Sequence, residues 1–344
     1  MKRTFDIWIV LPLIGLSLFS LFNVFGIKKD LFANQFFFFV VGFIALFILS
    51  RTGINFFKIN AITFYIFSII LLVLTFIVGE TVRGSKRWID LYFFQFQASE
   101  FLKPFFLVFL ADYLSKKKPN VKKYWFGAFV IFLVPFLIIF RQPDLGNSII
   151  YVLLFGSLIF FAGFSIRYFI YIFALFFLAL PVLWRFLKDY QKGRIISFIN
   201  PELDSQGIAY NLIQSVITVG SGGLWGRGLG LGTQSRFRFL PEYHTDFAYA
   251  SAVEQFGMVG GTVILLLFTL IIYRLIKRGF EEKNSLFNYF FLLGTASLLI
   301  ISVGINVGMN LGLLPVTGIA LPLISYGGSS IISTLMLLGL ALSI

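Results

Sequence analysis

Two acidic residues and the chain's only histidine lie within one short run, from Phe239 to Phe247. The run falls where a long polar segment re-enters an apolar stretch, and ionisable groups at a membrane boundary are costly unless they serve a function. Asp246 could act there as a general base that accepts a proton from an attacking hydroxyl group. An equally weighted alternative is that the run only begins a helix, with His244 or Thr245 as the cap and Asp246 in the first turn.

Four further polar residues stand inside or at the edges of apolar segments. Glu100 and Lys103 are spaced i, i+3, so they face the same side of a helix and can pair; structural support is favoured over direct chemistry. Asp144 follows a proline, and a helix cap and a site residue are equally weighted interpretations. Asn306 lies near the end of its segment, at the same membrane level as Asp246.

Acids and cations gather on one side of the predicted membrane. The acids are Glu100, Asp144, Glu242, Asp246 and Glu254, and the cations are Arg83, Lys86, Arg87, Arg194, Arg227, Arg236 and Arg238. An acid among cations at a lipid–water boundary suits an anionic, lipid-anchored substrate. A carboxylate could act as base while cations or a divalent metal hold a phosphate leaving group. These residues alone do not decide whether such a substrate is transformed or moved.

The elements that must position these residues are transmembrane helices. The chain is 58% apolar and 12% charged, its mean hydropathy is +0.92, and each bilayer crossing needs about 20 apolar residues. We therefore predict an all-α polytopic membrane protein, a single domain over 1–344 with about ten transmembrane helices. Their predicted positions are 7–26, 32–50, 61–79, 98–115, 124–140, 147–164, 166–184, 246–273, 285–306 and 314–342.

The basic residues predict the orientation of the chain. They precede the first span and fill the loops after the fourth and eighth spans. By the positive-inside rule these positions and both termini are cytoplasmic, and 185–245 becomes a large extracytoplasmic loop that carries much of the site. The same clustering argues against a nucleic-acid partner, although the net charge is +13. Cysteine is absent, which excludes a thiol nucleophile and a thiolate metal site.

Seven glycines fall between Gly220 and Gly232. Their spacing fits neither the P-loop nor the dinucleotide-binding fingerprint. A tight, close-packed loop at the membrane surface is favoured over a phosphate-binding nest.

Several motifs recur in an order that is typical of one family. They are GSKRWID at 84–90, FQASEFLK at 96–103, QPDLG at 142–146, QS at 214–215 with GSGG at 220–223, GTQS at 232–235, PEYHTDF at 241–247, LLPVTG at 313–318 and SYGGSS at 325–330. With these motifs the chain resembles, from end to end, the SEDS family (shape, elongation, division and sporulation). Within it, the chain resembles the RodA subfamily more than the division-specific FtsW subfamily.

The resemblance implies a peptidoglycan glycosyltransferase of the bacterial cytoplasmic membrane. Such an enzyme polymerises lipid II into β-1,4 glycan strands on the outer face for cell elongation and shape, with a class B penicillin-binding protein and the elongation machinery as partners. The alternatives are a lipid II flippase or other transporter, and an FtsW-type polymerase. A transporter is expected to place its binding groups near the midplane, so the outward bias of the ionisable residues favours the enzyme.

The resemblance also assigns roles to Asp246, Glu100 and Lys103, and the polar and charged residues of the outer face add further expected site residues. Asp246 is expected to be the catalytic base and, together with substrate phosphates, a ligand of a Mg or Mn ion. The expected supporting residues are Glu100, Lys103, Asp144, His244, Thr245, Glu242 and Asn306. The expected substrate-binding residues are Arg87, Lys86, Arg194, Gln214, Ser215, Arg236 and Ser325.

Overall fold

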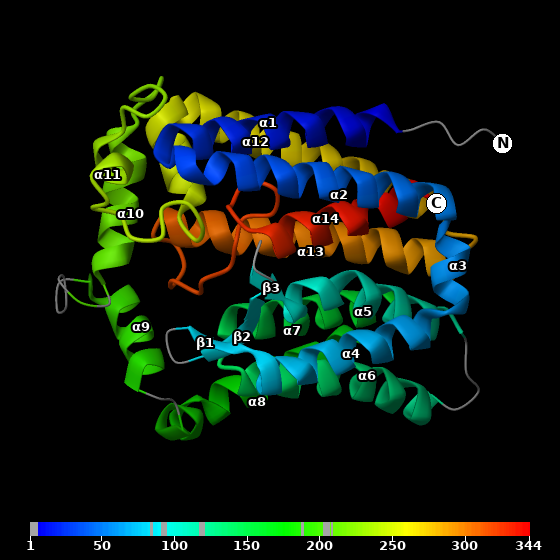
Figure 1. Cartoon of the computed structure of the whole chain (residues 1–344). Coiled ribbons are helices and arrows are strands. Elements are labelled where there is room, and N and C mark those ends of the chain that lie inside the picture. The colour runs from blue at the N-terminus through cyan, green and yellow to red at the C-terminus, as the bar shows by residue number, and fades with distance from the viewer. Residues whose placement is uncertain are drawn as a thin grey trace.

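The computed structural model describes residues 6–82, 85–90, 95–116, 121–186, 189–201, 207 and 209–344. Long helices lie side by side and run between the two ends of a bundle (Figure 1). We call the end at which α1 and α13 finish the loop end. The opposite end contains the start of α1 and the finish of α14.

Ten helices correspond to the predicted spans. They are α1 (Ile7–Ile27), α2 (Phe32–Thr52), α4 (Ala61–Val78), α5 (Ala98–Ser115), α6 (Val121–Arg141), α7 (Leu145–Phe161), α8 (Ile166–Phe186), α12 (Ala248–Glu281), α13 (Leu286–Asn310) and α14 (Gly328–Leu342). In the described part of the chain, six helices are long and apolar enough to cross a membrane, and α7 and α14 are shorter apolar helices. The prediction of an all-α polytopic membrane protein is confirmed.

Shorter elements connect these helices. They are η1 (Lys29–Leu31), α3 (Ile54–Ile59), α9 (Asp189–Ile199), α10 (Tyr210–Ser221) and α11 (Thr233–Arg236). A small antiparallel sheet, with strand order β1 (Glu80–Val82), β2 (Ser85–Asp90), β3 (Gln95–Gln97), was not predicted. In its register Trp88 lies opposite Gln97, and β3 leads directly into α5. The sheet therefore holds the first turn of α5 at the loop end.

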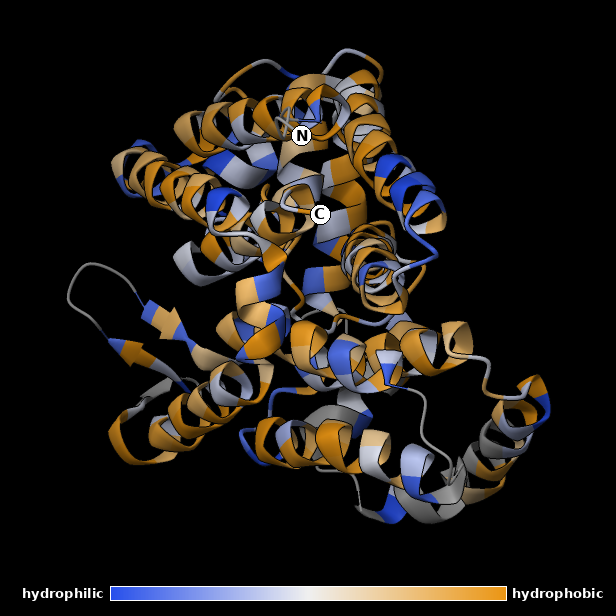
Figure 2. Cartoon of the chain, turned by 90° about the vertical axis from the view of Figure 1, so that its right-hand side faces the viewer, coloured by the Kyte–Doolittle hydropathy of each residue, from blue (hydrophilic) through white to orange (hydrophobic). Residues whose placement is uncertain are grey.

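Two helices form the centre of the bundle. α13 packs against α12, α5 and α7, while α5 also contacts α4 and α14. Almost every described side chain of α5 is buried, including Leu102, Phe106 and Leu110. Seen along the bundle, the outward surfaces of the helices are largely hydrophobic, as lipid contact requires (Figure 2). A polar side chain on α5 or α13 is consequently enclosed by protein rather than by lipid.

The last predicted span is wrong over its first half. Residues 314–327 are not helical, and α14 begins only at Gly328. Pro315 and Pro322 cannot continue a helical hydrogen-bond ladder, and Gly318 has a left-handed φ of 74°. Irregular backbone is tolerated at membrane depth only where protein satisfies its polar groups. Here Asn306 of α13 donates to the carbonyl of Ile319 at 2.7 Å.

The helix α12 is broken at Gly257, whose φ is 72° and ψ −177°. The glycine-rich segment 222–232 fills the break and replaces the two helical bonds that are lost there. Four backbone bonds make this exchange: Arg227 N to Glu254 O (2.8 Å), Gly228 N to Gln255 O (3.1 Å), Met258 N to Gly223 O (2.8 Å) and Val259 N to Leu224 O (3.2 Å). A β carbon on Gly226 would lie 2.2 Å from the carbonyl oxygen of Gln255. The predicted tight, close-packed loop is confirmed.

Candidate active site

Asp246 lies in the turn that precedes α12, and its side chain is half-buried. Its Oδ2 is 3.5 Å from the point at which a β carbon on Gly318 would stand, so the carboxylate faces the irregular 311–327 segment. The helix begins at Ala248 with Phe247 as its N-cap residue. The alternative in which His244 or Thr245 caps a helix with Asp246 in its first turn is therefore wrong.

Four consecutive carbonyl groups, from residue 243 to residue 246, are each held by a hydrogen bond. The donors are Ser251 Oγ to Tyr243 O (2.7 Å), Tyr326 N to His244 O (2.8 Å), Ser325 Oγ to Thr245 O (2.6 Å), and Asn306 and Asn310 Nδ2 to Asp246 O (2.9 and 3.1 Å). Buried carbonyl groups are rarely left unpaired, so a single bond of this kind would be ordinary. Four adjacent carbonyl groups that are bonded from three different elements fix the turn rigidly. The backbone under the Asp246 carboxylate is thus preorganised.

We call these hydrogen bonds to the carbonyls of residues 243–246 the clamp. Helices α1 and α2 hold the segment that supplies two of its donors. Ser20 Oγ donates to the carbonyl of Ile324 at 3.0 Å, and Gln35 Nε2 donates to Ser20 Oγ at 2.8 Å and to Ser325 O at 3.4 Å. Ser20 and Gln35 are fully buried. The side chains of Ser20 and Gln35, although they belong to apolar helices, therefore position the segment whose Ser325 binds the Thr245 carbonyl.

Asn310 joins three elements and was not among the predicted site residues. Its Oδ1 accepts from the N–H of Ala250 (3.0 Å), a first-turn donor of α12 that has no partner within the helix. Its own carbonyl accepts from Ser215 Oγ of α10 at 2.9 Å. The i, i+4 spacing from Asn306, which puts both amides on one helix face, could have identified it.

Replacing Asn310 by alanine should loosen the turn at Asp246. The change leaves a buried N–H of α12 without its acceptor, which commonly costs about 1–3 kcal/mol. We expect a lower melting temperature and faster amide hydrogen exchange at residues 246–250. Asn288→Ala, on the same helix but at the opposite end of the bundle, is the control. Unchanged exchange at 246–250 in the Asn310 variant would contradict the assignment.

Glu100 and Lys103 form the predicted ion pair. Lys103 Nζ lies 2.5 Å from Glu100 Oε1, and their side chains are only 7% and 11% exposed. The carbonyl of Glu100 accepts from Ser333 Oγ of α14 at 2.7 Å. The pair therefore sits inside the bundle, in the first turns of α5, where each charge depends on the other.

Asp144 has the predicted role of a helix cap, and its role in the site stays a prediction. It caps α7, because its Oδ1 accepts from Asn147 N at 3.2 Å. Its Oδ2 also accepts from the side-chain amides of Gln97 and Asn147, each at 3.0 Å. Arg87 approaches Oδ1 at 3.7 Å and donates to the carbonyls of Gln142 and Pro143. This cluster ties the small sheet to the start of α7.

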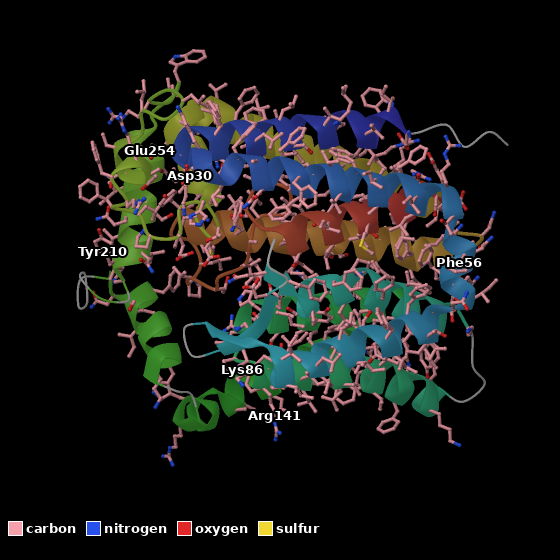
Figure 3. All side chains as sticks on the ribbon, viewed as in Figure 1. Asp30, Phe56, Lys86, Arg141, Tyr210 and Glu254 are labelled. Atoms are coloured by element: carbon pink, nitrogen blue, oxygen red, sulfur yellow. The ribbon has the colours of Figure 1, made fainter. Side chains whose placement is uncertain are left out.

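The remaining predicted substrate-binding residues differ in accessibility. Lys86 and Arg236 are exposed, Gln214 is half-buried, and Ser215 and Ser325 are buried with their hydroxyl groups engaged. Arg194 belongs to α9, but its side chain lies outside the described residues. Figure 3 shows Lys86, Tyr210 and Glu254 toward the loop end and Phe56 at the opposite end. Lys86 and Arg236 are therefore the accessible cations among the described members of this set.

Two other acids near this turn have structural contacts. Glu242 Oε2 accepts from the hydroxyl of Thr245 at 3.0 Å. Glu254 is fully buried, and its carboxylate accepts from the N–H groups of Gln234 and Ser235 at 2.8 and 3.0 Å. Among the described residues, no group of three or more His, Cys, Asp or Glu side chains could hold a metal ion. A cation at Asp246 would need further ligands from the substrate.

Comparison with known proteins gives the class to which this arrangement belongs. Residues 1–344 match the family described as cell cycle protein, which groups FtsW, RodA and SpoVE. Peptidoglycan glycosyltransferase MrdB of Escherichia coli K12 is 38% identical over 81% of this chain and 76% of its own length. Stage V sporulation protein E of Bacillus subtilis is 36% identical over 98% and 94%. The chain belongs to the SEDS family.

Solved structures agree with this assignment. The rod shape determining protein RodA of Thermus thermophilus is 27% identical, covers 99% of this chain and 96% of its own, and superposes with a TM-score of 0.74. A second solved chain belongs to a peptidoglycan synthase complex that coordinates polymerization and crosslinking. It superposes with a TM-score of 0.84 at 28% identity, over 98% of this chain and 97% of its own. The chain is RodA-like in sequence and in fold.

Proposed function

We propose that this chain is a peptidoglycan glycosyltransferase that polymerises lipid II on the outer face of the bacterial cytoplasmic membrane. The observation that carries the proposal is the rigidly clamped turn that presents the Asp246 carboxylate at the loop end. Relatives named as peptidoglycan glycosyltransferases support the reaction class. The start of α1 and the finish of α14 lie opposite the loop end, which supports cytoplasmic termini and an extracytoplasmic site.

The reaction needs a base, and Asp246 is the base in this proposal. Its carboxylate takes the proton from the 4-hydroxyl group of the acceptor N-acetylglucosamine. The acceptor oxygen forms a bond to the anomeric carbon of the donor sugar while the bond from that carbon to the pyrophosphate oxygen breaks. Displacement from the opposite face converts an α-linked donor into a β-1,4 glycan and releases undecaprenyl pyrophosphate. The clamp keeps the carboxylate in place while the proton moves.

The leaving pyrophosphate requires positive charge. Lys86 and Arg236 are exposed and can approach phosphate oxygens. Arg87 instead donates to the carbonyls of Gln142 and Pro143 and lies 3.7 Å from Asp144. The single carboxylate of Asp246 fits a Mg or Mn ion that takes its other ligands from substrate phosphates and water, the usual mode for Mg²⁺. When bound, such an ion neutralises charge that develops on the pyrophosphate.

We also infer a partner and a cellular role. The proposed partner is a class B penicillin-binding protein, the transpeptidase that crosslinks the new glycan. Support comes from the similar solved chain that belongs to a peptidoglycan synthase complex. The proposed role is cell elongation, which is supported by the likeness to the rod shape determining protein RodA of Thermus thermophilus at a TM-score of 0.74.

Polymerisation of fluorescent lipid II by the purified chain, with a class B penicillin-binding protein and a divalent cation, tests the function. Glycan ladders on a gel that a muramidase digests support the proposal. Transbilayer movement of lipid II without any glycan product would instead identify a transporter.

Removal of divalent cations should abolish polymerisation without unfolding the protein. Because the described chain supplies too few ligands for a structural metal site, the melting temperature should not change on chelation. Adding Mg or Mn back should restore the glycan ladder. Full activity in excess chelator would contradict the role of the cation.

A further inference from the structure

The glycine-rich segment 222–232 ends in an exposed apolar tip. Leu224 and Trp225 are 64% and 81% exposed, and Leu229 and Leu231 are 41% and 61% exposed. The backbone of this segment is locked into the break of α12 by the four exchanged hydrogen bonds. Large side chains held outward on a rigid backbone require a partner surface.

The position of the tip identifies the surface that it meets. Val259 N bonds to the carbonyl of Leu224, and both Met258 and Val259 are exposed on the transmembrane half of α12. Gly26, one residue before the end of α1, would place a β carbon 2.9 Å from the nitrogen of Gly230. The tip therefore continues the lipid-facing surface of α1 and α12 at the level where α1 leaves the membrane. In Figure 1 the loop lies at the rim of the bundle, at the loop end, beside the first turns of α12.

We propose that residues 222–232 form a membrane anchor that inserts Leu224 and Trp225 into the interface of the outer lipid leaflet. Tryptophan favours this level, where its ring is in apolar surroundings and its N–H reaches water or headgroups. Residues 220–233 contain no acid, and their one charge is Arg227. The Nε of Arg227 donates to the carbonyl of Ser221 at 2.7 Å, which leaves its other nitrogens available to lipid phosphates.

The anchor has a consequence for the site. Because the break uncouples residues 248–256 from the rest of α12, their orientation depends on contacts from outside the helix. The inserted segment bonds to the carbonyls of Glu254 and Gln255, and Asn310 accepts from the N–H of Ala250. Glu254, within this short helical piece, also holds the start of α11. Contact between the tip and lipid therefore adds to the support of the piece of helix that follows Asp246. This inference depends on the membrane topology and not on the glycosyltransferase reaction, so it can fail independently.

Depth-dependent quenching tests the anchor. The chain has no cysteine, so Trp225→Cys introduces a single site for an environment-sensitive fluorophore. In vesicles of phosphatidylethanolamine and phosphatidylglycerol, we expect nitroxide lipids labelled near the headgroup to remove most of the fluorescence, while aqueous iodide removes little. Leu266→Cys, exposed on the transmembrane half of α12, should respond most to a deeper nitroxide, and Lys86→Cys should respond to iodide.

A second label guards against effects of replacing the tryptophan itself. With the fluorophore at Leu231→Cys, headgroup-level quenching should persist when Trp225 becomes Phe and be lost when it becomes Asp. Strong iodide quenching at position 225 in vesicles would overturn the anchor. Iodide quenching that disappears only when a penicillin-binding protein is added would assign the tip to a protein partner instead.

Discussion

Glycan synthesis is lost in an Asp246→Asn variant that folds and melts like the parent protein; this is the largest effect we expect. The carboxylate is the base, and general base catalysis is typically worth about 10²–10⁴-fold in rate. The two asparagines of α13 bind the carbonyl of Asp246, which the substitution leaves in place, so the turn stays clamped in the variant. The measurement is the initial rate of lipid II polymerisation, together with a thermal melt.

Asp30→Asn is the matched control for this experiment. Asp30 is an exposed acid in η1, also toward the loop end (Figure 3), so it tests for a general effect of removing one negative charge there. It should leave the rate unchanged. Near-normal polymerisation by the Asp246 variant would remove the residue from the mechanism and leave the clamp without its proposed purpose.

Breaking the Glu100–Lys103 pair is the second large effect. Either single substitution, Glu100→Gln or Lys103→Met, leaves the partner charge buried and unpaired, which commonly costs about 3–5 kcal/mol. We expect both single variants to melt at clearly lower temperature and to lose activity. The double variant, Glu100→Gln with Lys103→Met, should recover most of the stability, because removing both partners of a buried pair is often nearly neutral.

The charge swap distinguishes a structural pair from a catalytic carboxylate. If the pair shapes the interior of the bundle, Glu100→Lys combined with Lys103→Glu should regain part of the lost activity. If Glu100 takes part directly in proton transfer, the swap moves the carboxylate by about one helical turn and the enzyme stays inactive. Single variants that melt normally and a stable but inactive swap would refute the structural assignment.

Local patterns in the sequence were enough to predict most of the helices and the ion pair. Hydropathy locates helices because burial in lipid demands long apolar runs, and the i, i+3 spacing of Glu100 and Lys103 fixes their contact through helix geometry alone. The carbonyl clamp at 243–246 was beyond such reasoning. Apart from Ser251, its donors come from α13 and from residues 325–326, and no local pattern relates those residues to the turn.

Two irregular segments were missed or misjudged for the same reason. Residues 314–327 are rich in apolar side chains, as a membrane helix is, and their prolines and glycines are the signal that they are not helical. The break at Gly257 depends on a segment about thirty residues earlier in the chain that offers equivalent hydrogen bonds. The energy of such breaks depends on long-range partners, which a single-sequence pattern does not contain.

The clamp also constrains how the protein is made. Ser20 enters the membrane with α1, but its partner carbonyl at Ile324 lies 304 residues further along the chain. Ser325, the partner of Gln35, likewise lies 290 residues after Gln35. At bacterial translation rates of roughly 5–20 residues per second, that interval is about 15–60 s. During it, these polar side chains must find temporary partners, such as water, insertion machinery or each other. The enzyme therefore cannot acquire a functional site until the ribosome has almost finished the chain, and C-terminal truncation should be as damaging as loss of Asp246 itself.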